Sequence, residues 1–529
     1  MSYLVTAPIY YANAKPHIGS LYTTILADIL ARAAILAGES PSSTRLLTGT
    51  DEHGLKIEQA AKKAGQAPAE FVASVSKSFE QSFLQFGLDR ETLVFAHTTD
   101  PRHRQLVQTV VKSLDQAGLI YKKEYRGWYC VGCEEYKEEY QESAAAELNV
   151  EAPSCPLHQH PLSLVTEPIY FFRLSQFQDD LIRVIESQRF RIEPATRRHE
   201  VLSFLAQPLR DIPISRQRSK VAWGIDFPLD CDHTVYVWLD ALLYYLTFSD
   251  ETLDSTGAKP SFWPANVQLI GKDILRFHAI ILPAVLLALD LPLPNCLLAH
   301  GFFTVEGQKM SKSLGNVLTP DSLLEALPGP LATEAVRYLL VTMTQVGEDA
   351  DITLTRFQDR YQAELVNGLG NLTQRLITLA VKAQFEVENW QALSGSTTDE
   401  ASDHTSDQTI DQTSDQTSRV AANFDLDQLK LDPNQPLTLT HQLEALWQQF
   451  EAINQRLSQS APWLGLNPEA TPAARHQAEQ VIAEELNTLR RLVQVSLSAV
   501  MPVTAQTIET QIATLTPVAL FPRLSTLKR

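Results

Sequence analysis

The stretch YLVTAPIYYANAKPHIGSLYTTILADILARAAIL, residues 3–36, joins a strand pattern to a helix pattern. Its first part, residues 3–11, is an apolar run that is typical of a buried strand. The apolar residues that follow recur at helical spacing; they are Leu21, Ile25, Ile29 and Leu36. A second strand pattern, residues 45–49, runs directly into Thr50-Asp51-Glu52-His53-Gly54. This strand–helix–strand order predicts a parallel sheet whose ligand site lies at the carboxyl ends of its strands.

Two short motifs suit the binding of a nucleoside triphosphate. Pro16-His17-Ile18-Gly19 opens the helix pattern, where exposed N–H groups favour an anion and a His side chain adds a donor. Lys309-Met310-Ser311-Lys312-Ser313 follows Gly307, and its two lysines and two hydroxyls suit a mobile clamp for phosphates. The usual phosphate loop, G-x-x-x-x-G-K-[ST], does not occur in the sequence. We therefore expect phosphate chemistry that does not use that loop.

The composition is that of an ordinary globular protein, with 44% apolar and 20% charged residues. At roughly 150 residues per domain, the 529 residues suggest about three domains. A net charge of −18 opposes a generally basic surface, so a nucleic-acid partner would have to meet a local basic patch. The longest apolar stretch, residues 279–289, is too short to span a bilayer, and the N-terminus lacks a basic leader. We expect a cytoplasmic protein without membrane association.

Three of the five cysteines follow a metal-binding spacing. Cys130-x₂-Cys133 and Cys155-x₂-His158 together offer three thiolates and an imidazole, the donor set of a closed tetrahedral zinc site. His160 is a rival fourth ligand, although the knuckle spacing favours His158. Four protein ligands leave no position for water, so the predicted zinc is structural. The alternative is a group of buried thiols beside a surface histidine.

Changes of pattern divide the chain into five parts. The predicted fold class is α/β: a Rossmann-type parallel-sheet catalytic domain with an inserted zinc-binding connective domain and a C-terminal α-helical bundle. The parts are 1–118 (first half of the catalytic domain), 119–227 (inserted domain), 228–300 (second half), 301–355 (the lysine-loop region) and 356–529 (helical domain). The α/β pattern resumes with strand signals at 234–239 and 267–271. Helices are expected near 357–384, 434–459 and 472–498, and the Ser-Asp-Gln-Thr repeats within 394–420 predict a disordered loop.

The two phosphate motifs, in this order, resemble the signatures of class I aminoacyl-tRNA synthetases. A wider set of motifs is similar to the methionyl-tRNA synthetase family from about residue 2 to Pro502, apart from the low-complexity insert. These motifs are Pro8-Ile-Tyr-Tyr11, Asn13, Pro16–Gly19, Thr48–Gly54, Gly127-Trp-Tyr-Cys130, Val237–Ala241, Gly271–Ile274 and Lys309–Ser313. The resemblance implies that L-methionine reacts with Mg²⁺-bound ATP to give methionyl-adenylate, and that the acyl group then passes to the terminal adenosine of tRNA(Met), initiator tRNA included.

The resemblance also implies roles in ATP binding. His17 would stabilise the phosphates, and Gly19 would let the adenine approach the backbone closely. Lys309 and Lys312 would neutralise the departing pyrophosphate, while Gly271 and Asp273 would meet the ribose and adenine. Ser20 stands where the family signature has a second His. A serine donates a hydrogen bond but carries no charge, so we expect the two lysines to carry more of the pyrophosphate charge.

For methionine, the resemblance implies a slot around the thioether formed by Ile9, Tyr11, Trp238, Ala241, Tyr245 and His278. Aromatic rings make favourable contacts with sulfur, which suits this substrate. Asp51 would bind the α-ammonium, and Arg216 would pair with Asp51. Taken without the resemblance, Trp238 and Tyr245 at helical spacing could equally be core residues, and a histidine such as His278 is more often a satisfied core group.

For the tRNA anticodon, the resemblance points to Asn367, Asn371, Arg375 and Trp463. The first three recur at four-residue spacing on one predicted helix, and aromatic, Asn and Arg side chains suit unpaired bases. The same face could be merely solvated and Trp463 a packing residue. Because the chain ends soon after the helical domain, we expect a monomer that needs no stable protein partner.

Two other classes compete with this interpretation. Another class I synthetase, for leucine, valine or cysteine, would share the ATP motifs, but no ~200-residue editing domain fits between residues 119 and 227. A zinc-stabilised nucleotidylyltransferase or nucleic-acid-binding module would have no use for Asn371, Arg375 and Trp463 on one surface. Amino-acid-dependent exchange of pyrophosphate into ATP separates these possibilities.

Overall fold

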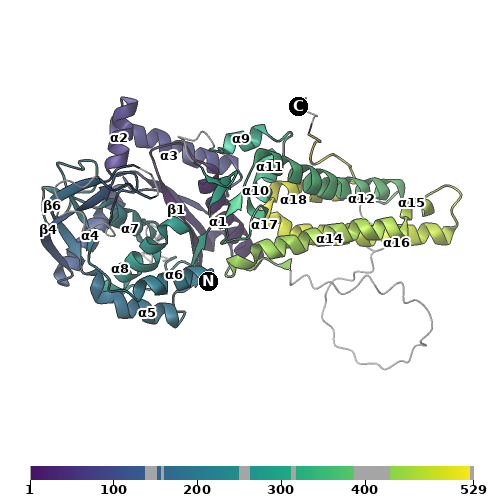
Figure 1. Ribbon diagram of the computed structural model, residues 1–529. Helices are drawn as coiled ribbons and strands as arrows, with labels where there is room; N and C mark the ends of the chain where they lie inside the picture. The colour runs from purple at the N-terminus through teal and green to yellow at the C-terminus, as the bar shows by residue number, and fades with distance from the viewer. Residues whose placement is uncertain are drawn as a thin grey trace, which may run out of the picture. The chain divides into compact units, whose positions relative to one another are not determined.

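The computed structural model describes residues 2–137, 152–156, 160–249, 262–310, 317–386 and 429–524. His158, Lys312 and the repeat segment within 394–420 lie outside these residues. The chain forms two compact units, shown in Figure 1. Unit 1 consists of Met1–Ser322, Thr344–Ile352 and Pro433–Leu437; unit 2 consists of Leu323–Met343, Thr353–Asp432 and Thr438–Arg529. The two units are defined by contacts between residues and not by function. The division into five functional parts therefore stays a prediction.

Unit 1 is built on a six-stranded sheet in which every pair of neighbours is parallel. Its strands, in spatial order, are β3 (Leu93–His97), β2 (Thr44–Asp51), β1 (Tyr3–Tyr11), β11 (Val267–Gly271), β12 (Cys296–His300) and β7 (Arg191–Glu193). The strands predicted at 3–11, 45–49 and 267–271 are confirmed. The chain leaves β1 towards β2 and β3, whereas β11, β12 and β7 lie on the other side. This reversal between β1 and β11 is a topological switch point, where open α/β sheets bind ligands.

Helices surround this sheet. They are α1 (Ile18–Leu36), α2 (Leu55–Ala64), α3 (Pro68–Gln85), α4 (Pro101–Gln116), α5 (Gln178–Glu186), α6 (Ala195–Leu205), α7 (Val237–Ser249) and α8 (Leu282–Ala288), with a π-helical turn at Phe277–Ile281. The helix α1 has the predicted extent and packs on β1, β2 and β11. By length and composition α1 is apolar enough to cross a membrane, but 83% of its most apolar window is buried, as in the core helix of a folded unit.

A four-stranded antiparallel sheet carries the cysteines. Its order is β5 (Glu135–Tyr136), β4 (Ile120–Cys130), β6 (Ser163–Phe172) and β8 (Ile212–Pro213). The strands β4 and β6 pair along their whole length, from Ile120 opposite Phe172 to Tyr129 opposite Ser163. The sequence that follows this pair returns to the parallel sheet as its edge strand β7. Residues predicted to belong only to the insertion therefore complete the main sheet.

The strand predicted at 234–239 is wrong over most of its length. The strand β10 covers only His233–Val235 and pairs with β9 (Ser215–Gln217) outside the main sheet. The helix α7 begins at Val237. Because α7 is buried and apolar on nearly all sides, its sequence has no helical periodicity to read, and its β-branched and aromatic start imitates a strand.

A three-stranded sheet contains Lys309, the first residue of the lysine motif. Its strands are β14 (Gln308–Lys309), β13 (Phe303–Val305) and β15 (Ala350–Asp351), in that order. The helix α9 (Pro320–Glu325) follows and contains the division between the two units.

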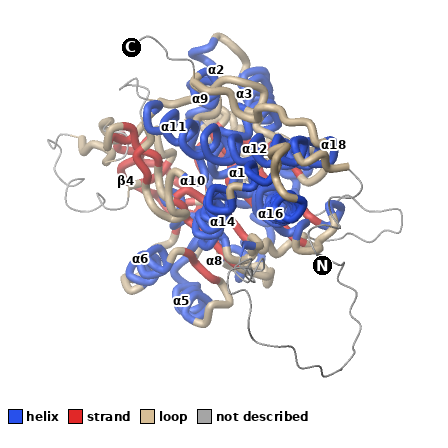
Figure 2. The backbone as a smooth tube through the Cα atoms, turned by 90° about the vertical axis from the view of Figure 1, so that its right-hand side faces the viewer, coloured by secondary structure: helices blue, strands red, loops and turns tan. Residues whose placement is uncertain are grey.

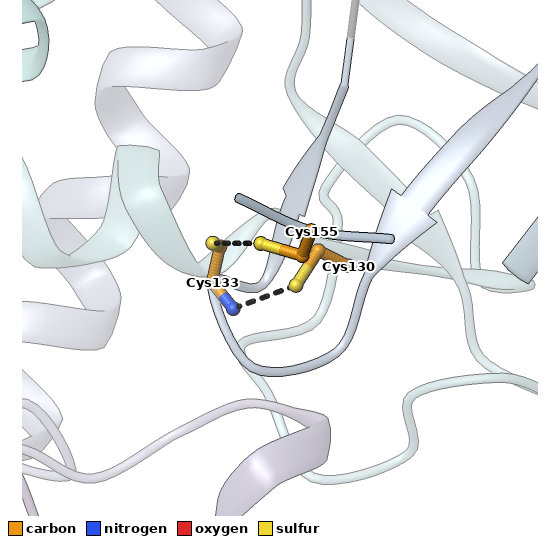
Figure 3. A group of neighbouring side chains, drawn as sticks. All are labelled: Cys130, Cys133 and Cys155. Carbon is orange, nitrogen blue, oxygen red and sulfur yellow. Dashed lines mark hydrogen bonds between the residues drawn. The ribbon is translucent and has the colours of Figure 1, made fainter. Parts of the chain in front are cut away.

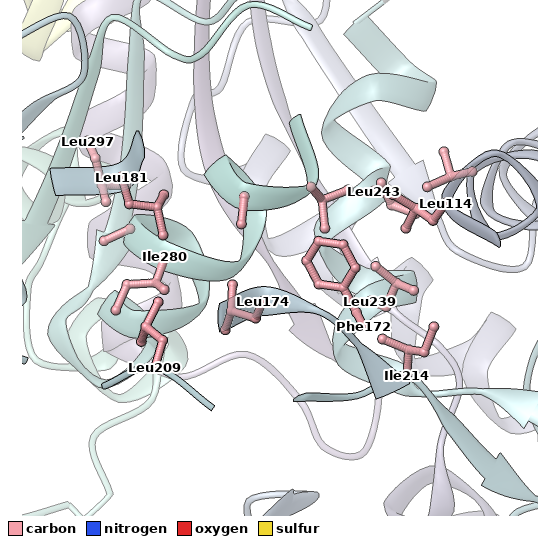
Figure 4. Close-up of a cluster of buried hydrophobic side chains, with 14 of the residues drawn as sticks. Leu114, Phe172, Leu174, Leu181, Leu209, Ile214, Leu239, Leu243, Ile280 and Leu297 are labelled. Atoms are coloured by element: carbon pink, nitrogen blue, oxygen red, sulfur yellow. The ribbon is translucent and has the colours of Figure 1, made fainter. Parts of the chain in front are cut away.

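One apolar cluster joins the antiparallel sheet to the helices of the parallel sheet (Figure 4). Phe172 of β6 lies among Leu239 and Leu243 of α7 and Leu114 of α4, all buried. The same cluster continues to Leu297 of β12. The antiparallel insertion therefore shares its core with the parallel sheet.

Unit 2 is helical in the residues described. Its elements are α10 (Ala332–Thr342), α11 (Leu354–Arg360), the π-helix η6 (Tyr361–Gly370), α12 (Asn371–Lys382), α14 (Leu439–Ser460), α15 (Pro462–Gly465), α16 (Pro472–Leu492), the π-helical turn η10 (Val493–Leu497), α17 (Ser498–Val500) and α18 (Pro502–Thr514). The helices α12, α14 and α16 run alongside one another (Figure 1), and the turned view of Figure 2 looks along them. The helices predicted in this region are confirmed.

The shared core gives a stability test. We expect Phe172→Ala to lower the free energy of unfolding by about 3–5 kcal/mol, since it removes a buried ring and leaves a cavity. Urea unfolding followed by circular dichroism measures this. Leu164→Ala on the same strand is the control, because Leu164 is 42% exposed and a surface change of this kind shifts stability by about 0.5 kcal/mol or less. Equal effects of the two substitutions would contradict a core centred on Phe172.

Candidate active site

A cavity of about 880 Å³ lies at the carboxyl ends of the parallel strands. Its wall includes Tyr11 of β1, Asp51 of β2, Gly271 of β11 and His300 of β12, each at or near the last residue of its strand. The start of α1 and the first turns of α7 complete the wall. The switch point between β1 and β11 is therefore hollow enough to hold a nucleotide and a second small substrate.

Twelve of the residues predicted for ATP and methionine line this cavity. They are Ile9, Tyr11, His17, Gly19, Ser20, Asp51, Trp238, Ala241, Tyr245, Gly271, Asp273 and His278. Lys309 ends the strand β14, but its side chain is not among those described. Residues from three distant parts of the sequence thus share one space, which is the arrangement that a two-substrate site requires.

Aromatic rings form one end of the cavity. The ring of Trp238 stacks on Phe277 with centroids 3.7 Å apart, and the ring of Tyr11 meets Trp238 edge-on at 6.2 Å. Trp238 lines the cavity, so it is more than a core residue. Stacked and edge-on rings leave polarisable faces and edges, which suit a thioether or another apolar side chain.

Tyr245 and His278 also line the cavity and form a neutral pair. The His278 Nδ1 lies 3.0 Å from the Ile274 carbonyl, an acceptor, so this nitrogen carries the proton. The Tyr245 hydroxyl then donates to Nε2 at 2.9 Å. Burial lowers the pKa of His278 to about 4, which keeps the imidazole neutral near pH 7. The apolar end of the cavity therefore contains no charge from this pair.

Asp51 is a buried carboxyl group in the cavity wall. Its side chain is 4% exposed, and its Oδ1 atom has no hydrogen-bond partner among the residues described. Burial, reinforced by the carboxylates of Asp240 and Glu134, raises the pKa of Asp51 well above its usual value. A buried carboxylate oxygen without a donor is costly, so an ammonium group bound here would be strongly stabilised.

A second buried carboxylate ties the end of β2 to α7. Asp240 accepts a hydrogen bond from His53 Nδ1 through one oxygen and from His103 Nε2 through the other, each at 2.7 Å. Burial opposes its charge, but the two imidazoles hold the pKa of Asp240 below its usual value. Since Asp51 precedes His53 and Trp238 precedes Asp240, this link fixes the end of β2 that carries Asp51 relative to the aromatic end.

His17 caps the N-terminus of α1. Its Nδ1 accepts from the backbone amides of Gly19 and Ser20 at 3.0 and 3.4 Å, so in this arrangement the imidazole proton lies on Nε2. The side chain is therefore arranged to donate one hydrogen bond through Nε2. It contributes a donor at the helix terminus, where an anion is already favoured.

Ser20 and Gly19 help to hold His17 in its capping position. The Ser20 hydroxyl donates to the His17 carbonyl at 2.7 Å and accepts from the His17 amide at 3.2 Å, which completes a capping box. A Cβ at Gly19 would lie 2.9 Å from the His17 ring, so the ring's own position requires this glycine. Both residues also line the cavity, and the predicted contacts of Gly19 with adenine and of Ser20 with ATP stay predictions.

Arg216 lies elsewhere than predicted. It pairs with Glu167 at 3.3 Å, and its guanidinium lies over the rings of Tyr129 and Tyr136. It does not line the large cavity, and no contact with Asp51 occurs among the residues described. The pairing of Arg216 with Asp51 is therefore absent here, because the buried Glu167 provides the nearer carboxylate.

Sequence reasoning missed several residues of the wall, among them Lys56 and His300. Lys56 follows the Thr48–Gly54 motif and places its ammonium 4.5 Å from the centroid of the Tyr11 ring. His300 ends β12 and lies 2.7 Å from the Thr23 hydroxyl. The carboxyl-end rule points to His300 once β12 is recognised as a strand. Lys56 has no such signal, since it lies on a helix.

The three cysteines lie together in the antiparallel sheet (Figure 3). The sulfurs of Cys130, Cys133 and Cys155 are all within 4.8 Å of one another, and those of Cys133 and Cys155 are 3.6 Å apart. Three thiols at this separation, free of disulfides, fit a soft metal ion such as zinc. His158 lies outside the described residues. His160 does not place a ring nitrogen close enough to the three sulfurs to belong to their group.

The four residues predicted for the anticodon lie on unit 2. Asn367 belongs to η6 and Asn371 to α12, and both are exposed. The guanidinium of Arg375 lies 5.0 Å from the centroid of the Trp463 ring, which is 37% exposed. Asn367 and Asn371 are four residues apart, but the helix changes from π to α between them. Both side chains are nevertheless exposed to solvent.

The parallel sheet with a hollow switch point and the histidine-capped helix, together with the lysine motif of the sequence, are the features expected of a class I aminoacyl-tRNA synthetase. The sequence model of a family described as tRNA synthetases class I (M) matches residues 3–377. The methionine--tRNA ligase of Thermosynechococcus vestitus is 42% identical over 382 residues, which cover 72% of this chain and 69% of that protein. The chloroplastic/mitochondrial methionine--tRNA ligase of Arabidopsis thaliana is 36% identical over 504 residues, or 95% of this chain and 76% of that protein.

The solved structures agree with these relatives. Mycobacterium tuberculosis methionyl-tRNA synthetase in complex with methionyl-adenylate has a TM-score of 0.82 and 31% identity, and the match covers 99% of both chains. The chain belongs to the methionyl-tRNA synthetase family.

The raised pKa of Asp51 predicts a pH dependence of methionine binding. Only the ionised carboxylate attracts an ammonium group, so the affinity for methionine should fall as the pH decreases through the pKa of Asp51, which lies above the ordinary carboxyl range. Isothermal titration of methionine across pH measures this. In Asp51→Asn we expect weak binding with no such dependence. An unchanged pH profile in that variant would contradict the assignment.

Proposed function

We propose that this chain is a methionine–tRNA ligase. It activates L-methionine with Mg²⁺-bound ATP to give methionyl-adenylate and pyrophosphate, and then transfers the methionyl group to the 3′-terminal adenosine of tRNA(Met), including initiator tRNA, with release of AMP. The observation that carries this proposal is one cavity in which a buried carboxylate, an aromatic end and a capped helix terminus face the same space.

In the first step, the protein positions two substrates and stabilises charge. Asp51 binds the α-ammonium, and the aromatic end around Trp238 takes the thioether. The methionine carboxylate oxygen attacks the α-phosphorus of ATP, and the bond to the pyrophosphate oxygen breaks. The Nε2–H of His17 donates to the phosphates, and Lys309 and Lys312 neutralise the departing pyrophosphate. Because the reacting groups are held side by side, most of the rate enhancement comes from orientation and electrostatics.

Gly271 and Asp273 place the nucleoside. A Cβ at Gly271 would lie 2.6 Å from an Asp273 carboxylate oxygen, so the carboxylate lies directly against the end of β11. From there it can accept hydrogen bonds from ribose hydroxyls. The second step uses the same bound adenylate: a ribose hydroxyl of the terminal adenosine attacks the methionyl carbonyl, and AMP leaves.

The cysteine group has a structural role in this proposal. Cys130, Cys133 and Cys155 would hold zinc, with His158 as the fourth ligand, and the ion would fix the loop between β4 and β5. The protein acts in the cytoplasm as a monomer. In unit 2, Trp463 and Arg375 offer a stacked pair to unpaired bases, and Asn367 and Asn371 offer edge hydrogen bonds, which suits an anticodon loop.

The experiment that tests this function is exchange of labelled pyrophosphate into ATP, measured separately with methionine, leucine, valine, isoleucine and cysteine. We expect exchange with methionine, at least ~100-fold above the other amino acids and without tRNA, because a thioether fits the polarisable slot better than a branched alkyl group does. Charging of tRNA(Met) should follow when tRNA is added. Preference for another amino acid, or exchange without any amino acid, would overturn the proposal.

The role of His17 is tested with the same exchange. We expect His17→Ala to lower its rate by at least ~100-fold, which corresponds to about 2.7 kcal/mol of transition-state stabilisation. His199→Ala is the matched control, since His199 is an exposed imidazole on α6 that does not line the cavity. A near-normal rate in His17→Ala would show that the helix terminus does not act on the phosphates.

A further inference from the structure

The loop between β4 and β5 contacts the cavity wall through its backbone. We define this knuckle loop as residues 130–134. Three successive carbonyls of the loop accept hydrogen bonds from residues at or next to the cavity. Gly132 accepts from Lys56 Nζ at 3.2 Å, Cys133 from Trp238 Nε1 at 3.4 Å, and Glu134 from the Tyr236 hydroxyl at 2.6 Å. The loop that carries two of the cysteines therefore also orients Trp238 and Lys56.

The Glu134 side chain continues this contact by capping α2. Gly54, the N-cap residue, has no side chain to satisfy the first amides of the helix. Glu134 is 1% exposed, and its Oε1 accepts from the Lys56 amide at 2.9 Å. A carboxylate at a helix N-terminus satisfies unpaired amides and interacts favourably with the helix dipole. The cap thus comes from a residue 78 positions away in the sequence.

Gly54 leaves the space that this carboxylate fills. A Cβ at Gly54 would lie 2.5 Å from Glu134 Oε1, and its φ of 106° is a conformation that favours glycine. Glu134 itself has a φ of 52°, which is uncommon for a residue with a side chain. The hydrogen bond from Tyr236 to its carbonyl holds it in this conformation. The positive φ angles of Gly54 and Glu134 thus together allow the Glu134 carboxylate to reach the start of α2.

The capped turn lies between Asp51 and Lys56. Asp51 ends β2, and α2 begins four residues later at Leu55. Lys56 lines the cavity and lies over the ring of Tyr11. Any displacement of the first turn of α2 would move Lys56 and the segment that carries the ammonium-binding carboxylate.

We propose that Glu134 is a positioning residue for the amino-acid substrate, one that fixes the start of α2 and, through the knuckle loop, the Trp238 ring. This inference rests on the proposed function, since it assigns methionine to the end of the cavity next to Asp51. The nucleotide end, at α1 and β11, has no contact with Glu134 among the residues described. Loss of the cap should therefore weaken the binding of methionine and leave the binding of ATP nearly unchanged.

The test is steady-state pyrophosphate exchange with wild type and four variants. In Glu134→Ala we expect the KM for methionine to rise at least about tenfold, with the KM for ATP within about twofold and kcat within about threefold. Glu134→Gln keeps an acceptor at Oε1 and should restore the KM for methionine to within about threefold of wild type. Glu134→Asp keeps the carboxylate, but its side chain is one methylene too short to reach the Lys56 amide, so it should behave like Glu134→Ala. If the alanine variant does not fold, the aspartate variant takes its place in the test.

Glu135→Gln is the matched control. Glu135 is the next residue, and its described ion pair is with Lys137, at 2.6 Å. It should leave all three constants unchanged. Zinc content, measured with a chelating dye after unfolding, should be the same in every variant, which separates the cap from metal binding.

Three results would overturn the inference. They are an unchanged KM for methionine in Glu134→Asp and Glu134→Ala, a parallel rise in the KM for ATP, and a loss of zinc that accounts for the effect. Failure of the proposed function has a different signature, because wild type itself would then show no methionine-dependent exchange.

Discussion

The parallel pairing of β2, β1, β11 and β12 is the constraint on which the rest of the structure depends. Parallel strands end at the same edge of a sheet, so residues that are far apart in sequence must meet there. Asp51, Gly271 and His300 are brought together in this way, and the reversal of strand order between β1 and β11 leaves the space between them open. The capped start of α1 reaches the same edge because α1 begins soon after β1 ends.

Within this cavity, charge is placed where a substrate can neutralise it. Among the residues described, Asp51 Oδ1 has no donor, whereas Asp240 has both oxygens bound by imidazoles. Tyr245 and His278 stay neutral at the apolar end. The protein therefore leaves an unfavourable desolvation at Asp51 Oδ1, whereas the Asp240 carboxylate is satisfied. In the proposed function, an ammonium group bound at Asp51 offsets that cost and so favours an amino acid.

The sequence predicted the features that depend on local pattern or on motif spacing. The strands at 3–11 and 267–271, the helix α1 and the cysteine group follow from short-range signals, and the family resemblance supplied twelve residues of the cavity. It failed where burial or long-range contacts decide. The helix α7 is buried and apolar on nearly all sides, so its sequence shows no helical periodicity, while Arg216 pairs with Glu167, 49 residues earlier in the chain. Glu134 escaped notice because a cap from a distant residue leaves no pattern near the helix it caps.

The structure of the complex with a non-hydrolysable analogue of methionyl-adenylate tests the central claim most directly, because it shows which group binds Asp51 Oδ1. The expected result is an analogue in the cavity with its ammonium within about 3.2 Å of Asp51 Oδ1, its side chain against Trp238 and its phosphate facing His17 Nε2. An analogue that leaves Asp51 Oδ1 without a partner, or that binds with its ammonium at another carboxylate, would contradict the claim.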